Sequence, residues 1–141
     1  MTDPLPAAPE SESPFKGKRG WRRLVRATRT SLEGLALAYR NESAFRQEVW
    51  LSVALAPVAI LLPFDAVERV LLLGSLLVLL AIELVNSGVE AAIDRISFDR
   101  HHLSKRAKDM GSAAVMMALL LVALTWLAIA GPKLIALLGR G

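Results

Sequence analysis

The sequence has no cysteine, and this absence excludes disulfide bonds, cysteine-ligated metal and a thiol nucleophile. It also lacks the short motifs G-x-x-x-x-G-K-[ST], G-x-G-x-x-G and H-E-x-x-H, so soluble-type nucleotide folds are excluded by pattern. His101 and His102 have no further His or Cys with which to complete a zinc set, and zinc is not expected. Any nucleotide chemistry would need carboxylate-held Mg²⁺ and scattered cations, which suffices because phosphoryl transfer depends mainly on positioning and charge stabilisation.

Charge is missing from long stretches of the chain, although charged residues make up 21% of it and hydrophobic residues 54%. Nearly all of the charged side chains lie in residues 1–48 and 94–109. The stretches between are long apolar runs of the kind that lipid selects, rather than a small water-soluble core. The predicted fold class is an all-α membrane protein with transmembrane helices at about 46–64, 67–94 and 108–131.

Proline and length define the limits of these helices. Residues 49–64 are uncharged but number only 16, fewer than the roughly 20 needed to cross ~30 Å of hydrocarbon, so flanking residues are expected to extend the helix. Pro57 within it is tolerable where neighbouring helices satisfy the freed carbonyl. Pro132 and Lys133 are expected to close the third helix at about Gly131.

The N-terminal region separates into a polar tail and an amphipathic segment. Residues 1–14 have too little apolar content to offset the entropy of ordering, so we predict a disordered tail. From about 20 to 40, apolar or small residues recur at helical spacing, with basic residues on the other faces. These residues are Trp21, Leu24, Val25, Thr28, Leu32, Leu35 and Tyr39. The pattern predicts a helix lying in the membrane surface, although a water-soluble helix packed on a neighbour has a comparable pattern.

Lysine and arginine are distributed unevenly about the predicted spans. Of 17 such residues, nine precede the first span and five lie between the second and third. Because basic loops stay in the cytoplasm, the N-terminus is predicted inside and the C-terminus outside. No cleavable signal peptide is apparent, since the first long apolar run begins only near Val49. A basic cluster could bind nucleic acid, but here it is more simply a cytoplasmic flank that attracts anionic lipid headgroups, and no nucleic-acid partner is expected.

Four polar side chains interrupt the second predicted span: Glu83, Asn86, Glu90 and Asp94. At about 100° per residue, Glu90 and Asp94 lie within about 20° of Glu83, and Asn86 lies about 60° away, so they share one stripe. Ionisable groups at this depth are costly unless they face a partner or a cavity, which makes them functional candidates. Glu90 lies roughly 10 Å nearer the cytoplasm than Glu83, giving a shallow carboxylate for a metal and a deeper one for a lipid group.

The alternative for these side chains is that they hold helices together, as polar groups do in membrane bundles. That interpretation stays open for Asn86 and Asp94, whereas two aligned glutamates are more charge than such a role requires. In the following loop, Lys108 could meet phosphate as a point charge. A solvated, positive-inside loop explains Lys105 and Arg106 without any ligand.

Three blocks of sequence closely resemble the prokaryotic diacylglycerol kinase family, a group of small trimeric membrane enzymes. The blocks are NESAFRQE at 41–48, ELVNSGVEAAIDR at 83–95 and AKDMGSAAV at 107–115. They occur in the family's order and spacing, and the resemblance covers about residues 20–131. This chain departs from well-known members at Leu32, where they have Trp, and at Thr30, where they have Tyr.

The resemblance implies roles for particular residues. Glu83 would be the general base that takes the proton from the lipid hydroxyl, and Glu42 and Glu90 would hold Mg²⁺ with the ATP phosphates. The remaining implied residues contact nucleotide (Arg23, His101, Lys108 and Asp109), take part in catalysis (Asn86) or contact the lipid substrate (Arg23, Gln47 and Ser112). The stripe of acidic residues supports Glu83 and Glu90 independently, whereas Glu42 and Gln47 rest on the resemblance.

As a member of this family, the chain is expected to phosphorylate diacylglycerol with MgATP as a homotrimer in the bacterial inner membrane. Small residues such as Gly88, Gly111 and Ser112 would permit close approach of helices. The nearest alternative is a kinase for a polyprenol such as undecaprenol, and the Phe-Arg-Gln-Glu and Lys-Asp-Met-Gly-Ser sequences favour diacylglycerol. A non-enzymatic membrane scaffold or sensor would explain the topology and the basic flank, but not the aligned glutamates.

Overall fold

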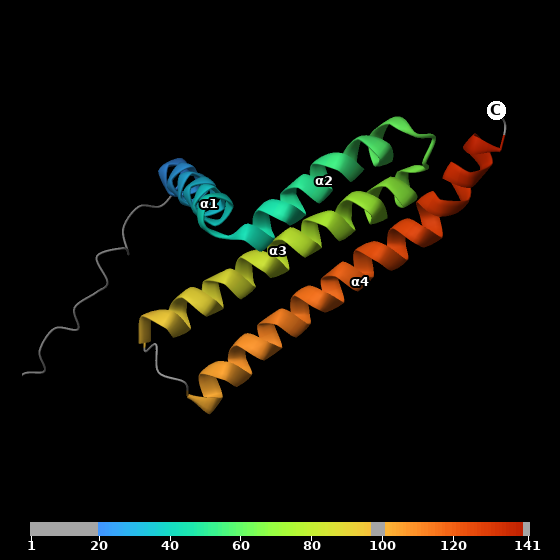
Figure 1. Ribbon diagram of the computed structural model, residues 1–141. Helices are drawn as coiled ribbons and strands as arrows, with labels where there is room; N and C mark the ends of the chain where they lie inside the picture. Colours follow the sequence, from blue (N-terminus) through green and yellow to red (C-terminus); the bar gives the residue numbers. More distant parts are fainter. Residues whose placement is uncertain (1–19, 97–100, 140–141) are drawn as a thin grey trace, which may run out of the picture. The chain divides into compact units, whose positions relative to one another are not determined.

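The computed structural model describes residues 20–96 and 101–139, which form four helices: α1 (Trp21–Asn41), α2 (Ser43–Leu61), α3 (Ala66–Ile96) and α4 (His102–Leu138) (Figure 1). The described residues contain no strand, so the predicted all-α class is confirmed. The predicted tail at residues 1–14 lies outside the described residues.

The chain divides into two units, residues 1–34 and 35–141. The described part of the first unit is the N-terminal portion of α1. Its hydroxyl side chains bond within the helix, with Thr28 Oγ1 donating to the Leu24 carbonyl at 3.0 Å and Ser31 Oγ to the Ala27 carbonyl at 3.0 Å. The predicted helix is confirmed here, and its position on a membrane surface stays a prediction.

In the second unit, α3 contacts both α2 and α4, and its contact with α4 is the more extensive. Its buried stripe consists of Leu72, Leu76 and Leu79, spaced four and three residues apart as one face of a helix requires. Along α4, the buried residues recur every four positions: Ala118, Val122, Trp126 and Ala130. The alanines in this row allow the two backbones to approach closely.

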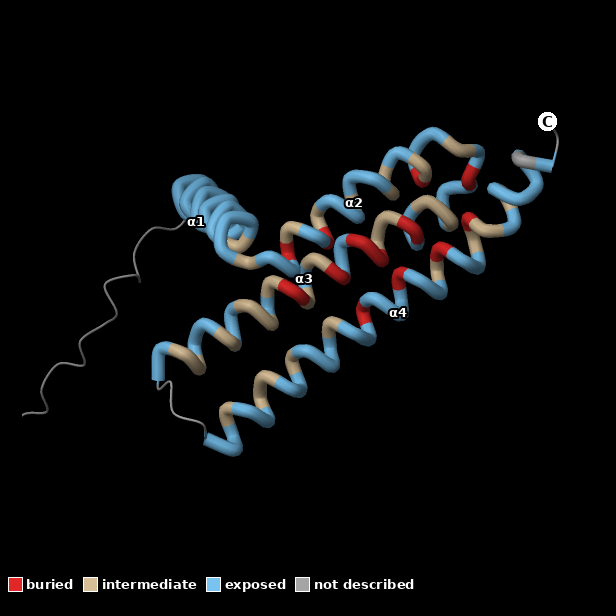
Figure 2. The backbone as a smooth tube through the Cα atoms, viewed as in Figure 1, coloured by how far each residue is buried: buried red, intermediate tan, exposed pale blue. Residues whose placement is uncertain are grey.

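Burial in α3 and α4 is concentrated in narrow stripes, which Figure 2 shows as red segments, whereas α2 has only three buried residues and α1 has none. Most large apolar side chains of α2, α3 and α4 are exposed, and all three helices are long and apolar enough to cross a membrane. Exposed apolar surface of this extent would be unstable in water and is stable in hydrocarbon. The three predicted spans are therefore confirmed as candidate membrane helices.

The turn between α2 and α3 is fixed by side chains that compensate for proline. Pro63 has no N–H to donate to the Ala59 carbonyl, four residues earlier, and Arg69 Nε donates to that carbonyl instead, at 3.1 Å. Asp65 and Glu68 cap the start of α3 reciprocally. The Asp65 N–H donates to Glu68 at 2.9 Å, and the Glu68 N–H donates to Asp65 at 2.8 Å.

The end of α4 differs from the sequence-based prediction. We expected Pro132 and Lys133 to close the helix, but α4 continues to Leu138. Proline removes one internal hydrogen bond and its ring crowds the carbonyl four residues earlier, but Lys133 beyond it gains contacts with the α2–α3 turn. Lys133 Nζ forms an ion pair with Glu68, donates to the Pro63 carbonyl at 3.2 Å, and lies 4.7 Å from the centre of the Phe64 ring.

Candidate functional site

The acidic residues of α3 continue its buried stripe. Glu83 takes the position four residues after Leu79, and its exposed fraction is 3%. Glu90 and Asp94 follow on the same face and are partly exposed. The helix therefore changes from an apolar to an acidic face at Glu83, with burial decreasing from Glu83 towards Asp94.

The start of α2 brings two more carboxylates to this face. Glu42 lies close enough to Glu83 to repel its charge, as does Glu90. Glu48, on the next turns of α2, is 6% exposed and interacts electrostatically with Glu83 as well. Oε2 of Glu48 is buried and has no hydrogen-bond partner within the described residues. The structure therefore gathers Glu42, Glu48 and Glu90 around Glu83, where the start of α2 lies beside the second half of α3.

Glu42 is positioned by a bend in the backbone. It is the single non-helical residue between α1 and α2, with φ −101° and ψ 116°, and its side chain forms no capping hydrogen bond. Arg46 fixes the bend by donating to the carbonyls of Tyr39 and Arg40, at 3.2 and 3.0 Å. These carbonyls belong to the last turn of α1, where they have no partner in the helix. The Glu42 carboxylate is thereby left available for a ligand.

From α4, Lys108 contributes a cation to the acidic face. Its Nζ donates to Oδ1 of Asp94 at 2.6 Å, and the ion pair is partly exposed. Lys108 also interacts electrostatically with Glu90. The ion pair connects α3 to α4 and holds a positive charge next to the carboxylates.

Asn86 of α3 lies against Gly111 of α4. Its Nδ2 donates to Oε1 of Glu90 at 3.2 Å, while its Oδ1 is buried without a partner among the described residues. A Cβ at Gly111 would collide with this amide, so a larger residue at that position of α4 would require the Asn86 side chain to move. The small residue at Gly111 therefore allows α4 to lie against the Asn86 side chain, as expected for close approach of helices.

Other site candidates do not join this group within the second unit. Gln47, Asp109 and Ser112 are exposed, and Asp109 pairs with Lys105 one turn away on α4. His101 instead has a structural contact that the sequence did not predict. It occupies the N-cap of α4, where its Nδ1 accepts from the Leu103 N–H at 3.3 Å. Arg23 belongs to the first unit.

Two residues of this region were not identified as candidates from the sequence. Glu48 meets the criterion that selected the α3 glutamates, because it is an ionisable side chain at the edge of an apolar run. It was assigned no role because it comes just before that run rather than within it. Arg46 carried no signal, since its carbonyl partners depend on the bend at Glu42.

The carboxylates near Glu83 are suitable ligands for a magnesium ion, but the described residues do not supply all of its ligands. The described residues contain no group of three or more His, Cys, Asp or Glu side chains able to hold a metal ion. Mg²⁺ is bound in nucleotide sites by one or two carboxylates together with phosphate oxygens and water. Glu42 and Glu90 both lie close enough to Glu83 to interact with its charge, and they would supply these two carboxylates.

The fold and this cluster define a small helical membrane protein with a partly buried carboxylate site. Residues 29–130 match the family model described as prokaryotic diacylglycerol kinase, and this range contains every site candidate except Arg23. The chain therefore belongs to the prokaryotic diacylglycerol kinase family.

Several curated proteins named diacylglycerol kinase are similar to the chain over most of their length. The protein from Pseudomonas aeruginosa is 52% identical over 116 residues, which cover 82% of this chain and 94% of that protein. The protein from Haemophilus influenzae is 45% identical over 107 residues, covering 76% and 91%. The protein from Escherichia coli K12 is 44% identical over 107 residues, covering 76% and 88%.

Proposed function

We propose that this protein transfers the γ-phosphate of ATP to diacylglycerol, forming phosphatidic acid in the bacterial inner membrane. The observation that carries the proposal is the buried Glu83 carboxylate, surrounded by further carboxylates on an apolar helix of a chain whose relatives are named diacylglycerol kinase. A charged group at such a position is costly unless it serves a reaction or a ligand.

In the proposed reaction, Glu83 accepts the proton of the lipid hydroxyl while the hydroxyl oxygen attacks the γ-phosphorus and ADP leaves. Its burial excludes water, which would otherwise compete as a phosphate acceptor. Asn86 orients Glu90 through its amide hydrogen bond and takes part in catalysis from the adjacent turn. The acceptor hydroxyl would come from a lipid that lies in the bilayer beside α2 and α3.

Glu42 and Glu90 are the proposed ligands of Mg²⁺, which would neutralise phosphate charge when bound with ATP. Lys108 supports the same region as a point charge, and it can exchange Asp94 for a phosphate oxygen. Further nucleotide contacts are proposed for Arg23, His101 and Asp109, and lipid contacts for Arg23, Gln47 and Ser112. These contacts rest on the resemblance described above.

We propose a homotrimer with cytoplasmic N-termini and periplasmic C-termini. The orientation is supported by the 14 of 17 basic residues that lie before the first span or between the second and third. Assembly is supported by one feature of the single chain, which is that much of the apolar surface of the three long helices is exposed. Cross-linking in native membranes, followed by sizing, would test the trimer.

The test of the activity is transfer of labelled γ-phosphate from MgATP by the purified protein, offered diacylglycerol and undecaprenol side by side. Glu83→Gln should lower the rate by about 10²–10⁴ if proton transfer is the role of this side chain. Glu68→Gln is the matched control, because Glu68 lies on the same helix but outside the carboxylate cluster.

The outcomes separate three possibilities. Labelled phosphatidic acid that is lost in Glu83→Gln and kept in Glu68→Gln would support the proposal. Preferential labelling of undecaprenol would assign the chain to a polyprenol kinase activity. Labelling of neither lipid by protein with native helix content would favour a scaffold or sensor. Near-normal turnover in Glu83→Gln would show that Glu83 is not the general base.

A further inference from the structure

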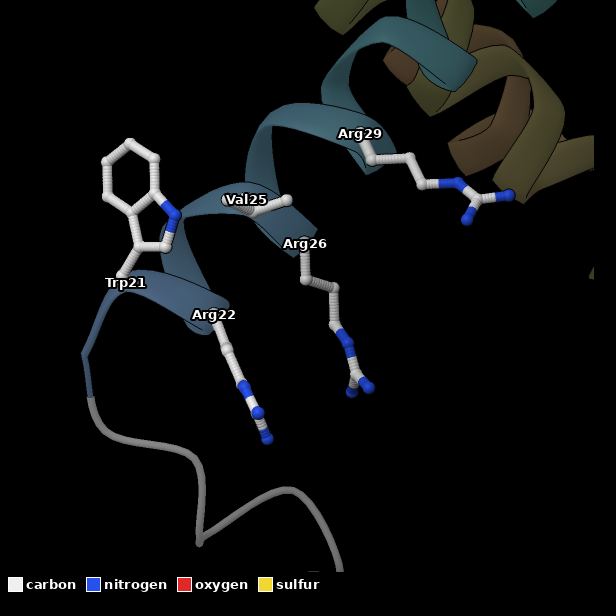
Figure 3. Close-up of a pocket in the computed structure, with 5 residues that line it drawn as sticks. All are labelled: Trp21, Arg22, Val25, Arg26 and Arg29. Atoms are coloured by element: carbon white, nitrogen blue, oxygen red, sulfur yellow. The ribbon is translucent and has the colours of Figure 1, made fainter.

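The first unit carries a basic hollow that the proposed reaction does not use. It is lined by Trp21, Arg22, Val25, Arg26 and Arg29 and has a volume of about 400 Å³ (Figure 3). The three arginines are spaced four and three residues apart, which places them along one side of the helix. Figure 3 shows the side chains of Arg22 and Arg26 leaving the helix in the same direction.

Two of these arginines have no acidic partner among the described residues. Arg29 Nε donates to Glu33 at 2.9 Å, but no described carboxylate pairs with Arg22 or Arg26. Two guanidinium groups one turn apart repel each other, and an anion between them removes that repulsion. The hollow is therefore suited to an anionic ligand.

The hydrogen-bonding geometry of the two guanidinium groups indicates which kind of anion would bind. Each guanidinium group can donate two parallel hydrogen bonds to phosphate oxygens, so Arg22 and Arg26 together favour an anion with several free oxygens. A phosphate monoester carries about −1.5 to −2 charges at neutral pH and three free oxygens. A phosphodiester carries a single charge and two free oxygens, so it satisfies the pair less well.

The same hollow has an apolar wall. Trp21 is 75% exposed, and Val25 lies one turn further along α1. Tryptophan is enriched at the membrane interface, where its ring contacts glycerol and the upper acyl chains. An anion with an apolar body fits both walls, and free phosphate fits only the arginines.

We propose that Arg22 and Arg26, assisted by Arg29 and Trp21, bind the phosphate-monoester headgroup of a membrane lipid of the phosphatidic acid class. The site is distinct from Arg23, which is on another side of α1 and does not line the hollow. If the proposed function holds, this lipid is the reaction product, and α1 retains it at the membrane surface. That consequence rests on the proposed function, whereas binding itself does not.

The test uses Trp21 as a reporter in the full-length protein. Trp50 and Trp126 are replaced by Phe, which leaves Trp21 as the only tryptophan. The protein is reconstituted without ATP in phosphatidylcholine bilayers that contain an equal fraction of brominated phosphatidic acid, phosphatidylglycerol or phosphatidylcholine. Bromine quenches a nearby indole, so quenching reports which lipid lies beside Trp21.

The proposal requires quenching to be strongest with phosphatidic acid and weakest with phosphatidylcholine. Replacing Arg22 and Arg26 with Gln should reduce the preference for phosphatidic acid over phosphatidylcholine by about fivefold for each arginine, because a basic residue at an anionic surface contributes ~1 kcal/mol. The charge-matched control, Arg40→Gln with Arg106→Gln, should keep the preference. Equal quenching by the three lipids would overturn the proposal.

Two further measurements test whether the hollow binds something other than a lipid headgroup. If quenching by phosphatidic acid is relieved by millimolar ATP or inorganic phosphate, the hollow binds soluble phosphate and the lipid assignment is wrong. If the preference appears only after residues 1–14 are deleted, the acidic tail of the chain is the natural occupant, which also overturns the proposal. Phosphate transfer is assayed separately on the same samples, so failure of lipid binding is distinguishable from failure of catalysis.

Discussion

Gly111→Ala probes the contact between α3 and α4 most directly. The added methyl group would collide with the Asn86 amide, which is already buried and bonded to Glu90. Relieving the collision requires Asn86 to rotate away or the helices to separate. Overpacking of this kind costs about 1–3 kcal/mol, while alanine gains up to about 1 kcal/mol over glycine from helix propensity.

Gly88→Ala is the matched control. Gly88 lies on α3 two residues from Asn86, and an added Cβ there meets no atom within 4 Å. The control gains the helix propensity without the collision. We therefore expect Gly111→Ala to be about 1–3 kcal/mol less stable than Gly88→Ala. Unfolding by increasing dodecyl sulfate in mild detergent, followed by circular dichroism, measures the difference.

A double substitution tests the assigned cause. Asn86→Ala with Gly111→Ala removes the amide that the new methyl group would strike, so stability should recover towards that of Asn86→Ala alone. The two substitutions should then show a coupling energy of about 1 kcal/mol or more. Phosphate transfer should not recover, since Asn86 is absent. The reasoning is refuted if Gly111→Ala is as stable as Gly88→Ala, or if the two substitutions prove additive.

Three further predictions concern other contacts. Lys133→Met should lower the free energy of unfolding by about 1 kcal/mol, because it removes the contacts at the α2–α3 turn. Lys105→Met, which breaks an exposed ion pair, should change it by less than about 0.5 kcal/mol. Equal losses in the two variants would argue against a stabilising role of the contacts at the turn. Lys108→Met should lower kcat/KM for ATP more than Asp94→Asn does; comparable losses would mean that the ion pair only connects the helices. Arg46→Met should raise several-fold the Mg²⁺ concentration that gives half-maximal activity, and an unchanged Mg²⁺ dependence would separate the bend from metal binding.

Periodicity and charge were sufficient to predict the helices and the α3 stripe. The positions of Glu83, Glu90 and Asp94 follow from a single helix, so their common face could be derived from spacing alone. The ion pair between Lys108 and Asp94 could not, because its partners lie on different helices and their register depends on packing. Sequence arguments therefore succeed within an element and lose accuracy between elements.

The error at Pro132 has the same origin. Proline is a reasonable signal for the end of a helix, because it removes a hydrogen bond and restricts the preceding residue. The continuation of α4 depends on Lys133 meeting Glu68 and Phe64, which are more than sixty residues earlier in the chain. Likewise, the buried Oε2 of Glu48 became apparent only when α2 was placed against α3.

The single-residue bend at Glu42 places a proposed metal ligand at the hinge between two helices. Because α1 and α2 are helical up to either side of it, a change in the tilt of α1 has to be absorbed by the backbone torsions of Glu42. The same rotation moves its carboxylate relative to Glu90. Lateral pressure, bilayer thickness and curvature act on a helix embedded in the lipid surface, which is the position predicted for α1. They would then shift the two proposed metal ligands relative to each other through one pair of torsion angles.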